Sequence, residues 1–327
     1  MSQALYPLTF QPIFKDRVWG GRRLEQLYGK ALPPGVPIGE SWEITDRPEG
    51  VSVITNGPLA GRDLRWLMEN HARELLGDSR PCAGRFPLLV KILDAQEKLS
   101  LQVHPPAHKA AELRGEPKTE MWYVADATPD ADLFVGLRRG ATRAEFERRI
   151  QDGSVAECFH RIPVKRGDSM FLPSGRVHAL GAGNVIFEIQ QNSDTTYRVF
   201  DWNRVGLDGK PRELHIPQAL ASIDFADFEP ALAPAEWRAE GRHEARYLAA
   251  CELFVVDALR LLPDSDINLG ANRVNVLAVT EGRLSVSWRN TVCELKPGDF
   301  CVVPAGCADD TAVRTERGAT FLQAIAH

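Results

Sequence analysis

A short run of alternating apolar and polar residues gives the clearest pattern in this chain. Residues 99–104 read Leu-Ser-Leu-Gln-Val-His, and a β-strand directs successive side chains to opposite faces. Ser100, Gln102 and His104 therefore share one face, and the apolar residues share the other. A regular polar row in such a strand needs solvent or a ligand to satisfy it. The pattern predicts a strand that presents a ligand-binding face.

Hydrophobic periodicity predicts further elements on both sides of this strand. Leucines at helical spacing predict a helix over 63–76, and a charged amphipathic pattern predicts another over 142–152. Shorter helices are expected near 18–28 and within 105–113. Further strands are expected at 40–44, 86–94, 185–190 and 195–202.

Two segments follow the same template. Residues 165–178 and 296–307 each contain Gly-Asp, four residues, then Pro, a small residue and Gly. The first copy places His178 three residues after Gly175, whereas the second has Asp309 at that offset. An internal duplication in which only one copy keeps a metal ligand is the simplest explanation. Many short strands with Gly/Pro turns, present twice, indicate two jelly-roll barrels.

The chain is long for a single hydrophobic core, at 327 residues. We expect an N-terminal metal-binding domain at 1–225 and a C-terminal metal-free domain at 245–327. The stretch 226–244 is rich in Ala, Pro and charge and is expected to be the linker.

Composition narrows the class of protein. Apolar residues make up 44% and charged residues 25%, and the net charge is −5, which argues against nucleic acid as a partner. No segment is apolar enough to span a membrane, and the N-terminus does not read as a signal peptide. Six scattered cysteines suit reduced thiols in the cytoplasm. A thiolate zinc site at Cys293, Cys301 and Cys307 is disfavoured because the spacing matches no usual pattern.

Several motifs, in order, carry a family resemblance. The segment from Gly167 to His178 resembles the second cupin motif. The chain as a whole closely resembles the type I mannose-6-phosphate isomerases, in their short bacterial form, over most of residues 10–215. The motifs that carry this resemblance lie at 18–21, 39–42, 100–105, 118–123, 177–179 and 188–202. The resemblance implies a mainly β fold, with two cupin-type jelly-roll barrels and a few short helices.

The resemblance also implies one divalent metal ion. Its ligands would be Gln102, His104, Glu120 and His178. Two imidazoles, a carboxylate and an amide oxygen suit Zn²⁺, and the same set could hold Mn²⁺, Fe²⁺ or Co²⁺.

The family reaction interconverts mannose 6-phosphate and fructose 6-phosphate through a cis-enediol. Arg198 matches the position of the family's essential arginine. Lys118 lies two residues before Glu120 and so faces the same side of a strand, which makes it a proton-transfer candidate if its pKa is lowered. Glu188 is a candidate base or a partner of the metal ligands, and the sequence does not decide which group takes the proton.

Phosphate binding is expected from residues farther along the pocket. Ser100 and Arg204 correspond to positions that contact phosphate in the family, and Lys91 on the apolar strand is a further candidate. Tryptophans near the motifs are expected to serve core packing more than sugar binding. His108 lies in a loop and is left out of the metal set.

The leading hypothesis is therefore a metal-dependent aldose–ketose isomerase that acts on a small phosphosugar as a monomer or homodimer. A non-catalytic sugar-phosphate-binding cupin is one alternative, and retention of Lys118, Glu188 and Arg198 argues against it. A metal-dependent dioxygenase is the other, and the expected phosphate donors argue against that one.

Overall fold

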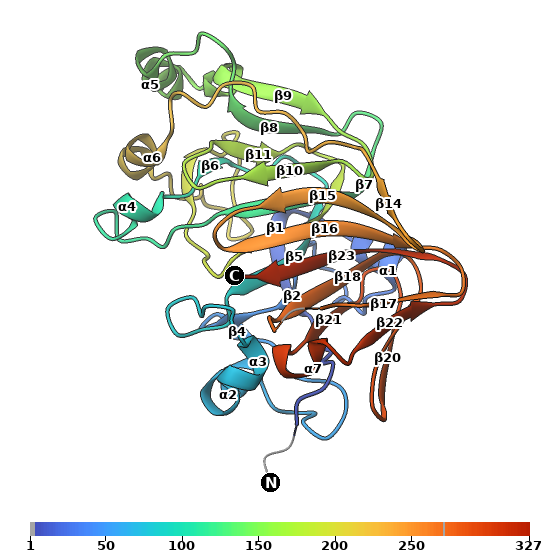
Figure 1. The fold of residues 1–327 in the computed structure, drawn as a ribbon. Coiled ribbons are helices and arrows are strands. Elements are labelled where there is room, and N and C mark those ends of the chain that lie inside the picture. The colour runs from blue at the N-terminus through green and yellow to red at the C-terminus, as the bar shows by residue number, and fades with distance from the viewer. Residues whose placement is uncertain (1–3, 271) are drawn as a thin grey trace.

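The computed structural model describes residues 4–270 and 272–327, and most of its regular structure is β-strand (Figure 1). Four large antiparallel sheets are accompanied by a two-stranded ribbon of β3 (Asp46–Arg47) and β4 (Gly50–Val51). The expectation of a mainly β, cupin-type fold with a few short helices is confirmed.

Two sheets form the N-terminal half, here called the N-terminal sheet pair. The six-stranded sheet has the order β1 (Ile13–Gly21), β2 (Ile38–Ile44), β5 (Leu88–Ala95), β12 (Asn184–Gln191), β7 (Glu120–Ala127) and β10 (Ser169–Leu172). The five-stranded sheet has the order β13 (Tyr197–Phe200), β6 (Leu101–Val103), β11 (His178–Leu180), β8 (Asp132–Leu137) and β9 (Phe159–Pro163).

Two further sheets form the C-terminal sheet pair. The six-stranded sheet has the order β14 (Arg238–Glu240), β15 (His243–Ala250), β16 (Phe254–Leu261), β23 (Ala319–Ala326), β18 (Asn275–Gly282) and β21 (Phe300–Val303). The four-stranded sheet has the order β17 (Ser265–Asn268), β22 (Ala312–Thr315), β19 (Leu284–Trp288) and β20 (Thr291–Leu295). Apart from β13, which has no counterpart in the C-terminal half, the strands of the two halves follow the same sequential pattern, as the duplication predicts.

The turns of the repeated template are the same in both halves. Gly167 and Gly298 have φ angles of 91° and 83°, which lie in the left-handed region that favours glycine. Asp168 Oδ2 accepts a hydrogen bond from the Lys165 backbone N–H at 2.9 Å, and Asp299 does the same for Lys296 at 3.0 Å. The Gly-Asp pair is therefore needed to build the turn, independently of any ligand.

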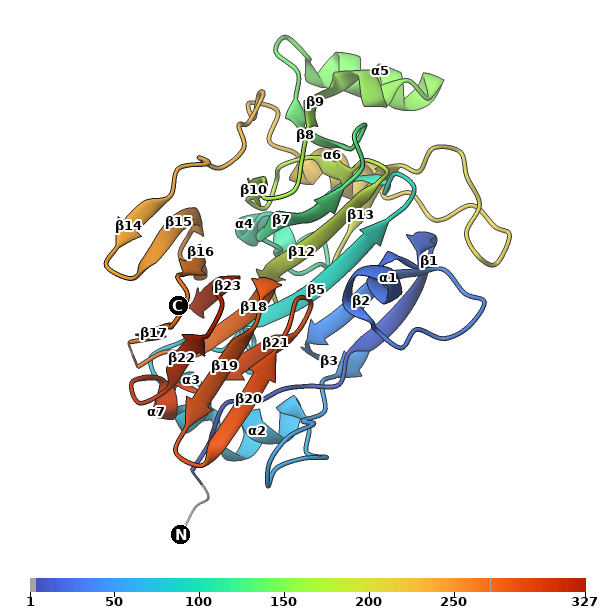
Figure 2. The same cartoon turned by 90° about the vertical axis from the view of Figure 1, so that its right-hand side faces the viewer.

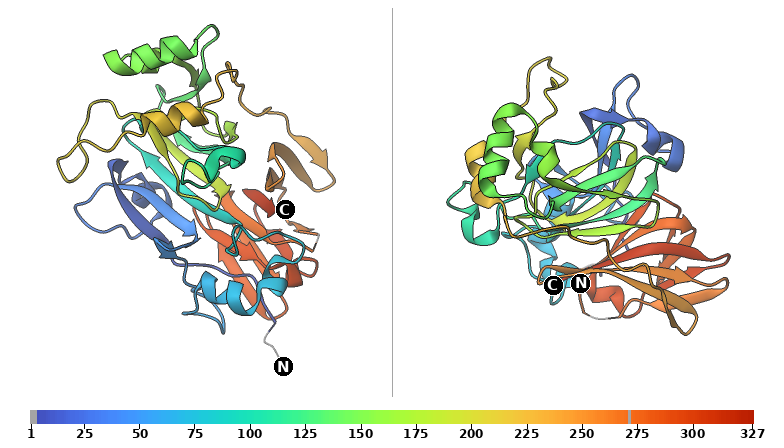
Figure 3. Two further views of the ribbon diagram at one scale, coloured as in Figure 1. Left: turned by 90° about the vertical axis from the view of Figure 1, so that its left-hand side faces the viewer. Right: turned by 90° about the horizontal axis from the view of Figure 1, so that it is seen from above.

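The two six-stranded sheets pack against each other in the middle of the molecule. Phe187 on β12 and Phe300 on β21 have ring centroids 5.3 Å apart, and both belong to a buried cluster that joins the two halves. The orange and red strands accordingly lie alongside the blue, cyan and green ones (Figures 2 and 3). The opposite face of the N-terminal six-stranded sheet packs on the five-stranded sheet through a separate cluster that includes Trp122 and Leu133.

Of the eight helical elements in the described part of the chain, α1 to α5 overlap the expected helices, whereas η1, α6 and α7 were not expected. Thr142 caps helix α5 (Arg143–Asp152) by accepting a hydrogen bond from the Glu145 N–H. The remaining helical elements are α1 (Arg23–Tyr28), α2 (Leu64–Asn70), α3 (Ala72–Leu76), α4 (Ala107–Ala110), the 3₁₀ helix η1 (Val155–Cys158), α6 (Ile216–Ser222) and α7 (Ala305–Ala308).

Three of the expected segments differ from the structure. The helix expected over 63–76 is two helices, because His71 has a non-helical φ of −137° and ends α2. Residues 18–21 are the end of β1, and α1 begins only at Arg23. The segment 226–244 contains β14, which pairs with β15, so part of the expected linker is a sheet edge. The division at 1–225, 226–244 and 245–327 stays a prediction.

In the part of the chain that the structure describes, no helix combines the length and the apolar character needed to cross a membrane.

The shared core leads to a stability prediction. Phe187 is fully buried between the halves, so Phe187→Ala should lower the free energy of unfolding by about 3–5 kcal/mol. Val292 is 56% exposed, and Val292→Ala should change it by less than about 0.5 kcal/mol. Urea unfolding measures both variants. Equal losses in the two variants would contradict the shared core.

Candidate metal centre and active-site cavity

Three buried side chains of the N-terminal sheet pair converge on one point. His104 follows β6, Glu120 begins β7 and His178 begins β11, and one ligand atom of each lies within 4.8 Å of the others. The Oε1 atom of Glu120 is 3.2 Å from Nε2 of His178 and 3.6 Å from Nε2 of His104. The structure thus brings together three of the four predicted metal ligands.

Backbone carbonyls orient both imidazole rings. Nδ1 of His104 donates to the Thr195 carbonyl at 2.7 Å, and Nδ1 of His178 donates to the Arg176 carbonyl at 2.9 Å. Because a carbonyl only accepts, each Nδ1 carries the proton and each Nε2 presents a lone pair. Hydrogen bonds of this kind are typical of metal-binding histidines.

Burial and charge set the protonation that a metal ion requires. Burial lowers the pKa of both histidines, to about 3 for His178, so the rings stay neutral. Burial alone would raise the pKa of Glu120, but Lys118 and His104 outweigh it and hold that pKa well below its usual range. His104 Nε2 and Glu120 Oε1 make no hydrogen bond to any described residue. Neutral imidazoles and a charged carboxylate with free lone pairs fit a divalent metal ion.

Gln102 lies beside this cluster in the sheet register. It pairs with His178 on β11, and its Nε2 is 3.3 Å from Nε2 of that histidine. Its Oε1 accepts a hydrogen bond from Ser100 at 3.3 Å. Direct coordination by the amide oxygen requires a half turn of the amide group, so the fourth ligand stays a prediction.

A cavity of about 520 Å³ adjoins the cluster through Gln102 and Lys118, which line the cavity and contact His178 and Glu120, respectively. It is lined on one side by charged residues of β2, β5 and β12 and by Lys118, and on the other by residues of β6, β13 and the 206–212 loop. Predicted residues that line it are Lys91, Ser100, Gln102, Lys118, Glu188 and Arg198.

One wall of the cavity holds buried charges of alternating sign. Lys118 Nζ is 2.8 Å from Glu120 and 3.9 Å from Glu188. Lys91 Nζ in turn lies 3.6 Å from Glu188, 3.8 Å from Glu40 and 3.5 Å from Asp194. Each buried charge has an opposite charge beside it, which is the condition for keeping it ionised.

Lys118 and Glu188, the two central groups of this wall, both have raised pKa values, but for different reasons. Burial would lower the pKa of Lys118, but Glu120 and Glu188 raise it, so the ammonium keeps its proton. The lowered pKa that proton transfer by Lys118 would require does not arise from the surrounding protein groups, which raise it. Burial raises the pKa of Glu188, whose Oε2 accepts a hydrogen bond from Trp122 Nε1 at 2.9 Å. A carboxylate with a raised pKa is a suitable proton acceptor near neutral pH.

The opposite wall carries two guanidinium groups. Arg198 pairs with Gln102 across β13 and β6, and its Nε is buried without a hydrogen-bond partner among the described residues. Burial and the charge of Arg212 both lower the pKa of Arg198. Two neighbouring cations, one lacking a carboxylate partner, favour an anion in this part of the cavity.

Arg204 lies outside the cavity lining in the described structure. Its guanidinium donates to Asp201 at 2.9 Å and to the Lys98 carbonyl at 2.6 Å. Arg212 also pairs with Asp201, at 2.6 Å, but it does line the cavity. The phosphate contact of Arg204 stays a prediction.

Six charged residues of the cavity lining have no role predicted from the sequence, namely Asp16, Arg17, Glu40, Asp194, Asp208 and Arg212. Glu40 and Asp194 lie inside motifs that carry the family resemblance, which is the signal that could have indicated them. Arg17 pairs with Glu40 at 2.7 Å, but no local pattern marks Arg17 or Arg212. Their placement depends on contacts between segments far apart in the chain.

Two buried tryptophans form hydrogen bonds to carboxylates of the cavity lining. Trp42 and Trp122 are almost fully buried, and their indole N–H groups donate to Glu40 and Glu188, respectively. The preference for core packing over sugar stacking is thus consistent with their burial, while each ring also positions a cavity carboxylate. His108 is exposed on α4, away from the cluster.

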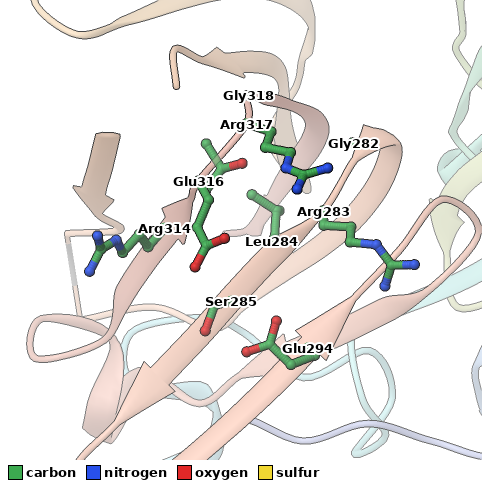
Figure 4. Close-up of a pocket in the computed structure, with 10 residues that line it drawn as sticks. Gly282, Arg283, Leu284, Ser285, Glu294, Arg314, Glu316, Arg317 and Gly318 are labelled. Atoms are coloured by element: carbon green, nitrogen blue, oxygen red, sulfur yellow. The ribbon is translucent and has the colours of Figure 1, made fainter. Parts of the chain in front are cut away.

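A larger cavity of about 860 Å³ lies at the C-terminal sheet pair (Figure 4). Its lining includes three arginines, Arg283, Arg314 and Arg317 (Figure 4). Glu316 and Ser285 belong to the same lining. It contains neither histidine nor cysteine, and among the described residues the only grouping suited to a metal ion is His104, Glu120 and His178. The chemistry therefore points to the N-terminal cavity.

Comparisons with known proteins agree with this location. The family model "Phosphomannose isomerase type I, catalytic domain" matches residues 8–135, which include Gln102, His104 and Glu120 and end before His178. Mannose-6-phosphate isomerase ManA of Bacillus subtilis is 42% identical, with 93% of this chain and 94% of that protein covered. The mannose-6-phosphate isomerase of Streptococcus mutans is 38% identical, with 91% of this chain and 92% of that protein covered.

The fold has a similar counterpart among solved structures. The crystal structure of mannose 6-phosphate isomerase from Bacillus subtilis superposes with a TM-score of 0.87 at 31% sequence identity. The match covers 99% of this chain and all of the other.

The cluster leads to a metal-binding prediction. Wild-type protein and His108→Ala should each retain about one Zn²⁺ per chain after gel filtration, whereas His104→Ala and His178→Ala should lose it. Elemental analysis of the folded proteins measures the content. If His104→Ala kept as much zinc as His108→Ala, the three-residue cluster would not be the metal centre.

Proposed function

This chain belongs to the type I mannose-6-phosphate isomerase family, and we propose that it interconverts mannose 6-phosphate and fructose 6-phosphate through a cis-enediol. The observation that carries the proposal is the arrangement of the cavity. A buried His/Glu/His cluster adjoins it through Gln102 and Lys118, a lysine–glutamate couple lies in one wall and two arginines lie in the other. The family relationship favours this reaction over a non-catalytic sugar-phosphate binder and over a dioxygenase.

His104, Glu120 and His178 would hold the metal ion, with Gln102 as the fourth donor. We propose Zn²⁺, because two imidazoles with a carboxylate and an amide oxygen are a usual donor set for that ion. When bound, the ion supplies an electrophile for the oxygens at C1 and C2 of the sugar.

The sugar would lie with its reacting end over the cluster, within reach of Arg198, and its phosphate toward Arg212. Ser100 is two residues from Gln102 along the strand, about 7 Å away, which suits a phosphate several carbons from the reacting atoms. Ser100 and the Arg212 guanidinium would donate hydrogen bonds to it. Lys91 stays a candidate, although its three carboxylate neighbours already balance its charge.

Proton transfer would use the opposite wall. Glu188 would take the proton from C2 of the aldose and return it to C1, since its carboxylate is buried with a raised pKa. Lys118 would donate a hydrogen bond to a sugar oxygen and keep its own proton. Arg198 would stabilise the negative charge that develops on the enediol oxygens.

All six cysteines are free thiols in the structure, which supports the proposal that the enzyme works in a reducing cytoplasm.

The assignment of the base can be tested with a matched pair. Glu188→Gln should lower kcat by roughly 10²–10⁴-fold with little change in KM, because it removes the proton acceptor and keeps the shape. Asp194→Asn, at a carboxylate that is 37% exposed in the same wall, should lower kcat far less. Coupled assay of fructose 6-phosphate gives the rates, and deuterium uptake from solvent reports proton abstraction. If Asp194→Asn lost the uptake and Glu188→Gln kept it, the base would be Asp194.

Phosphate recognition can be tested with Arg212 and Arg204, which both pair with Asp201. Arg212→Ala should raise KM about tenfold or more with a smaller change in kcat, since phosphate contacts contribute mainly uniform binding. Arg204→Ala should change KM little, because Arg204 lies outside the cavity lining. The reverse result would assign the phosphate contact to Arg204, as the sequence predicts.

A further inference from the structure

The C-terminal sheet pair contains a cavity of its own, of about 380 Å³, which has no part in the isomerase site. It is lined by residues of β14, β15, β16, β17 and β23, among them Tyr247, Asp257 and Gln323. A volume near the lower end of ligand pockets, roughly 300–1,000 Å³, suits one small molecule.

Strand register shows that this cavity occupies the same place in its half as the isomerase cavity does in the other. Leu172 on β10 pairs with Glu120 on β7, and Val303 on β21 pairs with Asn275 on β18 at the same point of the repeated template. Further along, Lys91 pairs with Glu188 between β5 and β12, and Asp257 pairs with Gln323 between β16 and β23. Equivalent positions can therefore be assigned strand by strand.

Four lining positions of the two cavities coincide in this register. The isomerase cavity has Glu40, Lys91, Leu93 and Glu188 where the C-terminal cavity has Ala245, Asp257, Leu259 and Gln323, respectively. The C-terminal cavity is thus the duplicate of the isomerase cavity with its side chains changed.

The changes remove the metal site. The position of Glu120 is taken by Asn275. Through β9 and β20 the register places Val313 at the position of Leu180, so Thr311, two residues earlier, falls at the position of His178. Asp309, the residue at the offset of His178 in the sequence template, ends the short helix α7 and does not take the histidine's place in the sheet. No metal ion is expected in this half.

The changes also leave two polar groups of the lining, the Asp257 carboxylate and the Gln323 side-chain carbonyl, available to accept hydrogen bonds from a ligand. Asp257 is partly buried, and no side-chain hydrogen bond or ion pair of its carboxylate occurs within the described structure. Its register neighbour Gln323 donates to Asn275 Oδ1 at 2.7 Å, which leaves the Gln323 carbonyl free to accept. Tyr247, opposite Asp257 on β15, is 52% exposed.

We propose that this cavity binds an uncharged monosaccharide. Sugar hydroxyls would donate to the Asp257 carboxylate and to the Gln323 amide oxygen, and the C–H face of the ring would pack on Tyr247. A phosphorylated sugar is disfavoured because the lining carries two carboxylates, Asp257 and Glu240, against one guanidinium, Arg238, and His243 already lies 3.3 Å from Glu240. The proposal depends on strand register and on these contacts, and not on the isomerase reaction.

Saturation-transfer NMR on the zinc-loaded enzyme tests the proposal. The isomerase cavity is kept filled with an equilibrated mixture of mannose 6-phosphate and fructose 6-phosphate, and D-mannose, D-glucose and D-fructose are then titrated in turn. At least one of these sugars should show saturable transfer. Asp257→Ala should weaken that binding by about ten- to hundredfold, because it loses a hydrogen bond to a charged group.

Matched variants separate a local effect from a general one. Asp266 on β17 is exposed and lies next to Ile267 on the opposite face of the strand, so Asp266→Ala should bind the sugar like wild type. Tyr247→Ala should also weaken binding, and because the Tyr247 side chain is 52% exposed, thermal unfolding should show the fold unchanged. Absence of transfer to all three sugars, or equal affinity in Asp257→Ala, Tyr247→Ala and Asp266→Ala, would overturn the proposal.

Discussion

The buried charge of Glu120 is the constraint on which the rest of the site depends. Its carboxylate is fully enclosed at the start of β7, where an isolated charge would be very costly. Lys118 at 2.8 Å balances part of this cost, and the lone pairs of His104 and His178 face the same point. A cation held by these three groups would supply the remaining balance. The buried charge of Glu120 therefore underlies both the metal-binding chemistry of the site and the stability of the residues around it.

From Glu120 the compensation spreads outward along one wall. Lys118 pairs with Glu188, which in turn pairs with Lys91. Lys91 also pairs with Glu40, the last carboxylate of the row, and Glu40 pairs with the partly exposed Arg17. Burial alone would raise the pKa of Glu40, but Lys91 and Arg17 lower it to about 2. Removing any member would leave its neighbour with an uncompensated buried charge. The row thus restricts how far any one of these side chains can be changed alone.

The two halves show which parts of the pattern serve folding and which serve chemistry. The Gly-Asp turn and the alternating strand pattern occur in both halves, so the sequence was sufficient to predict the duplication and the face shared by Ser100, Gln102 and His104. The meeting of His104, Glu120 and His178 followed from the family motifs. Arg212 was not predictable, because its position depends on the path of the loop after β13 and on a shared partner, Asp201. The break at His71 was also missed, because leucine spacing continues across it.

Burial on both faces explains how a site of this kind keeps its geometry. One face of β12 carries Glu188 toward the cavity, and the next residue, Phe187, packs into the core shared with the other half. A slip of one residue would place a carboxylate in that core and a phenyl ring in the cavity, so the register of β12 is strongly specified. The same argument applies to β23, where Leu322 faces the shared core and Gln323 faces the second cavity. The back-to-back packing of the six-stranded sheets therefore fixes both cavities at once, and leaves their linings free to differ.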